Sequence, residues 1–202
     1  MPAALQHEIA ALAAAHMVDE GLEARAACQR ALQRLGLPAR TPLPDAATLD
    51  AAIREHLAIF HADTQPAELH ALRGVALQWM QRLAAFEPLV GGAVWHGTAT
   101  RRSDVHLQLF SDDPKAVEIA LINAGVRYDA QRARGLHGRE VEVLSVAQRC
   151  EALQDWVTVH LWVNDTAAQR GARLADALGR TPRGTAAELQ ALLHADAEGA
   201  QA

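Results

Sequence analysis

Residues 90–110 read VGGAVWHGTATRRSDVHLQLF, and this stretch decides the fold that the sequence predicts. A glycine pair, Gly91 and Gly92, is followed by a short polar spacer, and Asp104 then opens a strand of alternating apolar and polar residues. Residues two apart on a strand share a face, so we expect the side chains of Asp104 and His106 to point the same way. The stretch therefore predicts a glycine turn beside a strand whose polar face begins with a carboxylate.

The composition of the whole chain limits the functional classes. With 202 residues, of which 50% are hydrophobic, the chain is long enough for one or two compact units. The formal net charge of −5 argues against a broad basic surface for nucleic acid. Lys115 is the only lysine and there is no GxxxxGK[ST] loop, which excludes P-loop hydrolysis. Cys28 and Cys150 have no metal-ligand spacing, so we expect buried thiols in a reducing compartment.

The first residues show neither a basic start nor the uninterrupted apolar run of a secretory signal. No other segment reaches the length of a membrane span. We therefore expect a cytoplasmic protein that does not act at a membrane.

Apolar residues at helical spacing predict that residues 1–88 form a helical region. Four such stripes begin near Leu5, Cys28, Leu49 and Leu69. The linkers between them are short, so we expect the helices to form a bundle or to wrap the domain that follows.

Residues 89–165 have the pattern of a small α/β core. We expect strands at 93–96, 105–109, 141–146 and 157–163, and one helix that starts at Asp113 and ends at Gly125. This order predicts an α+β fold in which a small mixed sheet has helices on one side. Residues 166–202 are expected to form a partly helical tail, in which Thr185 and Glu188 make a capping box.

These features resemble the minimal core of the nucleotidyltransferase superfamily, which has a polymerase-beta-like fold. The resemblance covers residues 90–109 and, more loosely, the sheet up to Val163. In that family, two carboxylates on one strand and a third from a neighbouring strand hold two metal ions at the phosphates of a nucleotide. The resemblance implies transfer of a nucleotide from an NTP to a small molecule, a protein or an RNA end, with magnesium or manganese as cofactor.

The resemblance also implies which residues form the site. It makes Asp104 a metal ligand, and it places His106 where the family has its second carboxylate. Glu142, or alternatively Glu140, stands as the third ligand, on what we expect to be the neighbouring strand. The implied catalytic residues are therefore Asp104, His106 and Glu142, and the implied metal ligands are Asp104 and Glu142.

Two glycine positions are open for the nucleotide phosphates. Gly91 and Gly92 have the usual spacing to Asp104, whereas Gly97 and Thr98 resemble the Gly-Ser pair that ends a strand in this family. Two arginines, Arg101 and Arg102, flank the motif and are suited to binding a triphosphate.

His106 is the departure from the family pattern. Magnesium prefers hard oxygen ligands, and a neutral imidazole supplies neither the negative charge nor the oxygen. A histidine there suits manganese or zinc, acid–base chemistry or a hydrogen bond to a phosphate. His160 also lies on the polar face of a predicted strand. If His106 and His160 are paired across the sheet, they become a stronger candidate for a functional site.

Three function classes remain open from the sequence. The first class is an active transferase with a changed metal site. The second is a catalytically inactive protein of the same fold that binds a nucleotide or a protein partner. The third is an α/β interaction module. The helical first half has two interpretations, recognition of a substrate or contact with a second copy of the chain in a homodimer.

Overall fold

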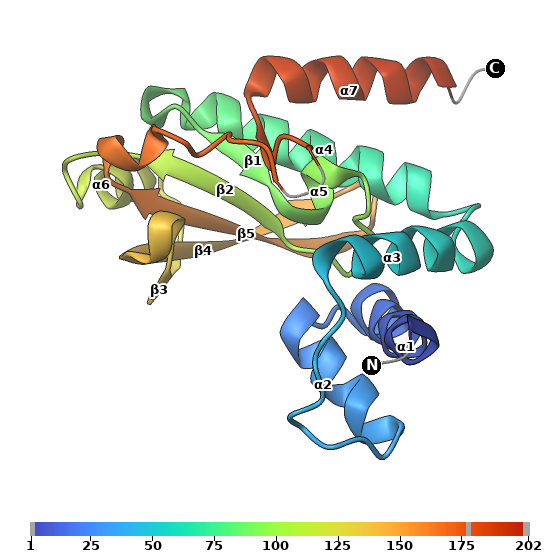
Figure 1. Ribbon diagram of the computed structural model, residues 1–202. Helices are drawn as coiled ribbons and strands as arrows, with labels where there is room; N and C mark the ends of the chain where they lie inside the picture. Colours follow the sequence, from blue (N-terminus) through green and yellow to red (C-terminus); the bar gives the residue numbers. More distant parts are fainter. Residues whose placement is uncertain (1–2, 177–178, 200–202) are drawn as a thin grey trace. The chain divides into compact units, whose positions relative to one another are not determined.

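The computed structural model describes residues 3–176 and 179–199, and the chain divides into two compact units. The first unit consists of Met1–Pro66 and Thr98–Ser103, and the second consists of Ala67–Gly97 and Asp104–Ala202. The predicted α+β class is confirmed, because helices come first and a mixed sheet with further helices follows (Figure 1).

The first unit contains three helices, α1 (Ala3–Glu20), α2 (Ala24–Arg34) and α3 (Ala46–Phe60). The helices α1 and α2 pack through a buried apolar cluster that includes Ile9, Ala13 and Leu32. The segment Thr98–Ser103 belongs to this unit, and Thr100 Oγ1 donates a hydrogen bond of 3.4 Å to the carbonyl of Val18. The apolar stripes of the sequence therefore predicted these helices correctly.

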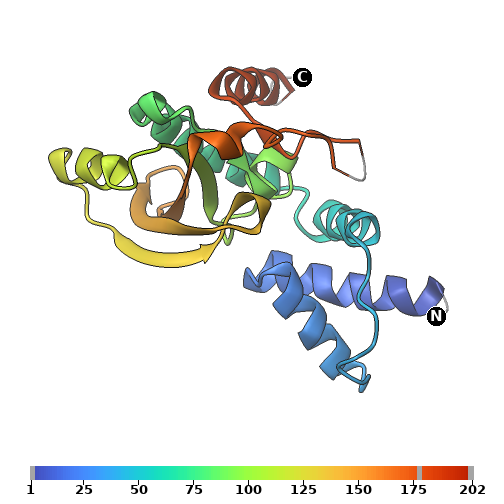
Figure 2. The same cartoon turned by 60° about the vertical axis from the view of Figure 1, so that its left-hand side comes forward.

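The second unit is built on a six-stranded sheet with the order β3-β4-β5-β2-β1-β6. The strands are β1 (Leu89–Gly91), β2 (Val105–Phe110), β3 (Asp129–Arg134), β4 (Glu140–Cys150), β5 (Asp155–Asn164) and β6 (Arg183–Gly184). β2 and β5 are parallel, and all other neighbours are antiparallel. Figure 2 shows that the sheet is strongly twisted.

Helices and short 3-10 turns surround this sheet. They are α4 (Gln65–Arg82), η1 (Ala84–Phe86), α5 (Gly92–His96), α6 (Ala116–Asn123), η2 (Leu136–Gly138), η3 (Thr166–Gln169) and α7 (Ala186–Gly199). The buried Arg73 of α4 donates to the carbonyl of Val94 in α5 at 3.3 Å and to Asp196 of α7 at 2.7 and 2.9 Å. One arginine thus joins three helices, and most of α4 is part of the sheet unit rather than of the helical first half. None of the helices in the described part of the chain has the length and apolar character needed to cross a membrane.

The structure differs from the local predictions at α5, at the start of α6 and at β3. Residues 93–96 form the helix α5 instead of a strand, because the chain turns at Gly92, whose φ is +65°. The helix predicted with Asp113 as its cap and Pro114 at its first position begins later, at Ala116, although the Asp113 carboxylate accepts the N–H of Lys115 at 2.9 Å as a capping residue does. The strand β3 was not expected, because it is an edge strand on which every residue except Ala133 is exposed.

Candidate functional site

The glycine pair lies beside the start of β2. Gly91 is the register partner of His106 in the antiparallel pair β1–β2. A Cβ atom added at Gly92 would stand 3.7 Å from Cδ2 of His106. The fold therefore brings Gly91 and Gly92 to the strand that carries His106.

Gly97 and Thr98, the other glycine position left open by the sequence, are placed differently. Gly97 ends α5 in the left-handed conformation, with φ at +81°. A side chain at Gly97 would meet Arg73 and Leu69 of α4, and Thr98 is already part of the first unit. Gly97 and Thr98 thus lie away from the register pair that joins Gly91 to His106.

A polar cluster stands on the face of the sheet that begins at Asp104. β5 is the strand next to β2, and its His160 is the register partner of His106. The Nε2 atom of His160 lies 3.2 Å from Oδ2 of Asp104, and the two imidazole rings stack with their centroids 4.9 Å apart. We call Asp104, His106 and His160 the Asp-His-His cluster.

Two further side chains orient the imidazoles of this cluster. Trp162 Nε1 donates to His106 Nδ1 at 3.3 Å, so the proton of neutral His106 is on Nε2. Ser145 Oγ lies 2.9 Å from His160 Nδ1. Because Asp104 accepts from His160 Nε2, neutral His160 receives its second hydrogen bond from the Ser145 hydroxyl. The tilt of both rings is thus fixed from neighbouring strands.

The cluster is polar, partly open to solvent and contains one carboxylate. The hydrogen bond from His160 is the largest effect on the pKa of Asp104, and it lowers this pKa. Partial burial raises the pKa, but the nearby charges of His160 and His106 and a hydrogen bond from Thr158 lower it further. The Asp104 side chain is 46% exposed and that of His160 is 18% exposed. Asp104 is therefore ionised at neutral pH, and solvent reaches it directly.

The prediction that Glu142 joins Asp104 as a metal ligand is wrong. β5 lies between β2 and β4, so Glu142 is not on the neighbouring strand. Its register partner is Val163, which is on the face of Val105 and not on that of Asp104. The physical reason is that β5, although later in the sequence than β4, inserts beside β2 as its parallel neighbour.

The environment of Glu142 is also different. Its carboxylate is 3.8 Å from Lys115 Nζ, and its pKa is raised by burial and by a hydrogen bond with Glu118. Glu140, the alternative ligand, pairs instead with Arg132, whose NH1 is 3.2 Å from its carboxylate. Both glutamates therefore have partners away from the Asp-His-His cluster.

The two arginines of the motif belong to the other unit. Arg101 and Arg102 are exposed and lie in Thr98–Ser103. A Cβ atom at Gly21 would be 3.0 Å from the carbonyl oxygen of Arg102, so this segment passes close to the end of α1. The structure groups the arginines with the helical unit, and not with the sheet that carries Asp104.

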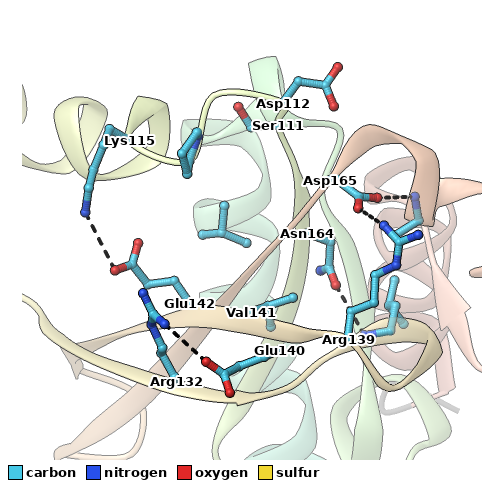
Figure 3. Close-up of a pocket in the computed structure, with 14 residues that line it drawn as sticks. Ser111, Asp112, Lys115, Arg132, Arg139, Glu140, Val141, Glu142, Asn164 and Asp165 are labelled. Carbon is cyan, nitrogen blue, oxygen red and sulfur yellow. Dashed lines mark hydrogen bonds and ion pairs between the residues drawn. The ribbon is translucent and has the colours of Figure 1, made fainter.

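A pocket of about 560 Å³ lies where β2 and β5 end and β4 begins (Figure 3). Three cationic side chains line it, and each faces a carboxylate: Lys115 with Glu142, Arg132 with Glu140, and Arg139 with Asp165. Since each of these positive charges is paired, the pocket does not offer a strong site for phosphate. Sequence reasoning missed this pocket because its lining comes from segments far apart in the chain.

Metal binding at Asp104 is not supported by the geometry. Over residues 3–176 and 179–199, Asp104 does not belong to any group of three ligand side chains close enough to share an ion. The cluster thus supplies hydrogen-bond donors and one negative charge. Comparison with known protein families and with curated proteins finds no match to the chain.

Proposed function

We propose that this is a nucleotidyltransferase-like protein that binds the phosphates of a nucleotide beside Gly91, Gly92 and the Asp-His-His cluster, without two-magnesium transfer chemistry. The position of the glycine pair beside β2 supports the nucleotide part of the proposal. The side chains around Asp104 support the absence of nucleotide-transfer activity. They are the main observation behind the proposal.

Two-metal catalysis needs several carboxylate oxygens around a pair of ions. The side chains that lower the pKa of Asp104 are His160, His106 and Thr158, and in the described part of the chain no second carboxylate forms a three-ligand group with Asp104. An imidazole does not replace an oxygen ligand of magnesium. A site of this composition therefore lacks the ligands that would hold the ions.

Imidazoles suit phosphate in another way. A protonated or correctly oriented imidazole donates hydrogen bonds to phosphate oxygens, and the proton of neutral His106 is on Nε2 because Trp162 holds Nδ1. The Asp104 carboxylate already accepts a hydrogen bond from His160, which reduces its repulsion of an incoming phosphate. His106 thus presents an N–H to phosphate where the resembled family uses metal ions, whereas both nitrogens of His160 are engaged by Asp104 and Ser145.

The proposal predicts nucleotide binding that depends on the two histidines. The melting temperature of the protein is measured with ATP, GTP, CTP and UTP in the presence of EDTA. We expect at least one nucleotide to raise it, and we expect His106→Ala and His160→Ala to weaken binding at least tenfold, about 1.4 kcal/mol. His194→Ala is the matched control, because this exposed histidine lies on α7.

Circular dichroism of each variant shows whether it is folded, so a loss of binding is not confused with unfolding. Failure of all four nucleotides to bind would contradict the nucleotide part of the proposal. Transfer of a labelled nucleotide that requires magnesium or manganese and disappears in Asp104→Ala would contradict the inactive site and favour an active transferase.

A further inference from the structure

Two histidines of the first unit converge on one aspartate. Asp19 is near the end of α1, His56 is in the last turns of α3, and His61 caps that helix. His61 Nε2 lies 2.8 Å from Oδ1 of Asp19, and His56 Nε2 lies 3.1 and 3.2 Å from its two carboxylate oxygens. One ligand atom from each of the three residues lies within 4.8 Å of the other two. We call these residues the Asp19 triad.

Helix packing sets the positions of the triad. The helices α1 and α3 make extensive contact within the first unit. The N–H of His61 donates to the carbonyl of Leu57 at 2.9 Å, which fixes the backbone of the cap. The His56 ring packs against Phe60 at a centroid distance of 4.7 Å. The two imidazoles are thus held on a defined framework rather than on a mobile loop.

The three side chains of the triad differ in their exposure to solvent. The side chains of His56 and His61 are 14% and 27% exposed, whereas that of Asp19 is 46% exposed. The nitrogen ligands therefore come from a mostly covered position, and the carboxylate stands at the surface. An ion bound between them would keep one side open to water.

The ligand atoms are near enough to one another to share one ion. Zinc binds nitrogen at about 2.0–2.1 Å and oxygen at about 2.0–2.2 Å, so the ligand atoms of a tetrahedral site stand about 3.3–3.5 Å apart. The nitrogen–oxygen distances here, 2.8–3.2 Å, are a few tenths of an ångström shorter. A small outward movement of the rings would admit the ion.

The donor set also selects the class of metal. Two imidazole nitrogens and one carboxylate are ligands for zinc and for related transition metals, whereas magnesium and calcium prefer oxygen only. Nε2 of each imidazole lies against the same carboxylate. Without a metal, each imidazole must therefore carry a proton on Nε2 to donate a hydrogen bond to Asp19. A metal ion replaces both protons and satisfies three ligands at once.

We propose that Asp19, His56 and His61 form a binding site for one divalent transition-metal ion, Zn²⁺, with a fourth coordination position open to water. The site lies wholly within the first unit and does not depend on the proposed nucleotide function. A metal with three protein ligands and an open position can bind a fourth ligand or activate water.

The test uses the full chain without a polyhistidine tag, stripped of metal with a chelator and then dialysed. Zn²⁺ is titrated in competition with a chromophoric chelator, and Co²⁺ is added to a second sample. We expect one zinc ion per chain, a visible d–d absorption band from Co²⁺ that Zn²⁺ removes, and no competition from Mg²⁺. The cobalt spectrum is measured on the unmodified protein, so this readout does not depend on the folding of a variant.

Variants identify the ligands. Asp19→Asn, His56→Ala and His61→Ala are each expected to weaken zinc binding at least tenfold. His7→Ala is the matched control, since His7 is an exposed histidine of α1 that contacts the carbonyl of Ala3. The proposal would be overturned by the absence of stoichiometric zinc binding, by zinc affinity that Asp19→Asn and His61→Ala leave unchanged, or by equal competition from Mg²⁺.

Discussion

Gly184 of β6 touches the ring of Trp95, and no larger residue fits there. A Cβ atom at Gly184 would lie 2.0 Å from Cζ3 of Trp95. The indole is held in place, because its Nε1 donates to the carbonyl of Thr181 at 2.7 Å. The tryptophan is a residue of α5, so this contact joins the strand at the sheet edge to the helix that follows the glycine pair.

Gly184→Ala is expected to lower the free energy of unfolding by about 1–3 kcal/mol, because the added methyl group overpacks the contact with Trp95. Gly74→Ala is the matched control: Gly74 lies inside α4, and a Cβ there meets no atom within 4 Å. The control should gain about 0.5–1 kcal/mol from helix propensity. Urea denaturation measures both values, and effects of the same sign would contradict the described packing.

The sequence predicted correctly that Asp104 and His106 share a strand face, but it placed the wrong third residue beside them. Alternation along a strand is a local property, so the shared face of these two residues was predictable. The position of β5 between β2 and β4 is a property of the sheet, and no local pattern reports it. His160 was therefore visible in the sequence as a polar-face histidine, while its pairing with Asp104 became clear only in the fold.

Placing additional carboxylates on this face should create a magnesium site. In the double variant His106→Asp with His160→Asp, three carboxylates replace the Asp-His-His cluster. We expect magnesium at ten times its Kd to stabilise this variant by about 1.4 kcal/mol and to leave the unmodified protein unchanged. Thermal unfolding with and without magnesium measures the difference. An equal response of both proteins would show that these positions do not converge.

At the level of single elements, the capping box predicted for the last helix is present. The N–H of Thr185 donates to the Glu188 carboxylate at 2.8 Å, and the N–H of Glu188 donates to Thr185 Oγ1 at 3.3 Å. These reciprocal bonds depend only on local sequence, which explains why they could be predicted. β3 and α5 depend on tertiary context, because an exposed edge strand and a five-residue apolar segment have no distinctive period.

The same box predicts an acid-sensitive contribution to stability. The backbone hydrogen bond from Thr185 lowers the pKa of Glu188 in the folded protein. The stability that this hydrogen bond contributes is therefore fully present above the pKa of the unfolded chain, about 4.3. It is lost as the pH falls through the lower pKa of the folded protein. Thr185→Ala should cost about 1 kcal/mol at neutral pH. Glu188→Gln should reduce the loss of stability between about pH 6 and about pH 3. Denaturation curves at the two pH values test this, and an unchanged acid dependence in Glu188→Gln would argue against the box.

At the scale of the whole molecule, the chain carries two distinct polar sites on two units. The Asp-His-His cluster is on the sheet of the second unit, and the Asp19 triad is on the helices of the first. The sequence predicted a helical part and an α/β part. It could not show that most of α4 belongs with the sheet, or that Thr98–Ser103 returns to the helices, because both depend on long-range packing.

We expect a nucleotide to bind to the second unit without help from magnesium. Calorimetric titration of the nucleotide that gives the largest thermal shift, carried out once in EDTA and once in magnesium, measures this directly. We expect binding in both buffers, with dissociation constants that differ by less than tenfold. Binding that appears only with magnesium would contradict this expectation. The site would then bind magnesium ions, which one carboxylate and two imidazoles should not hold.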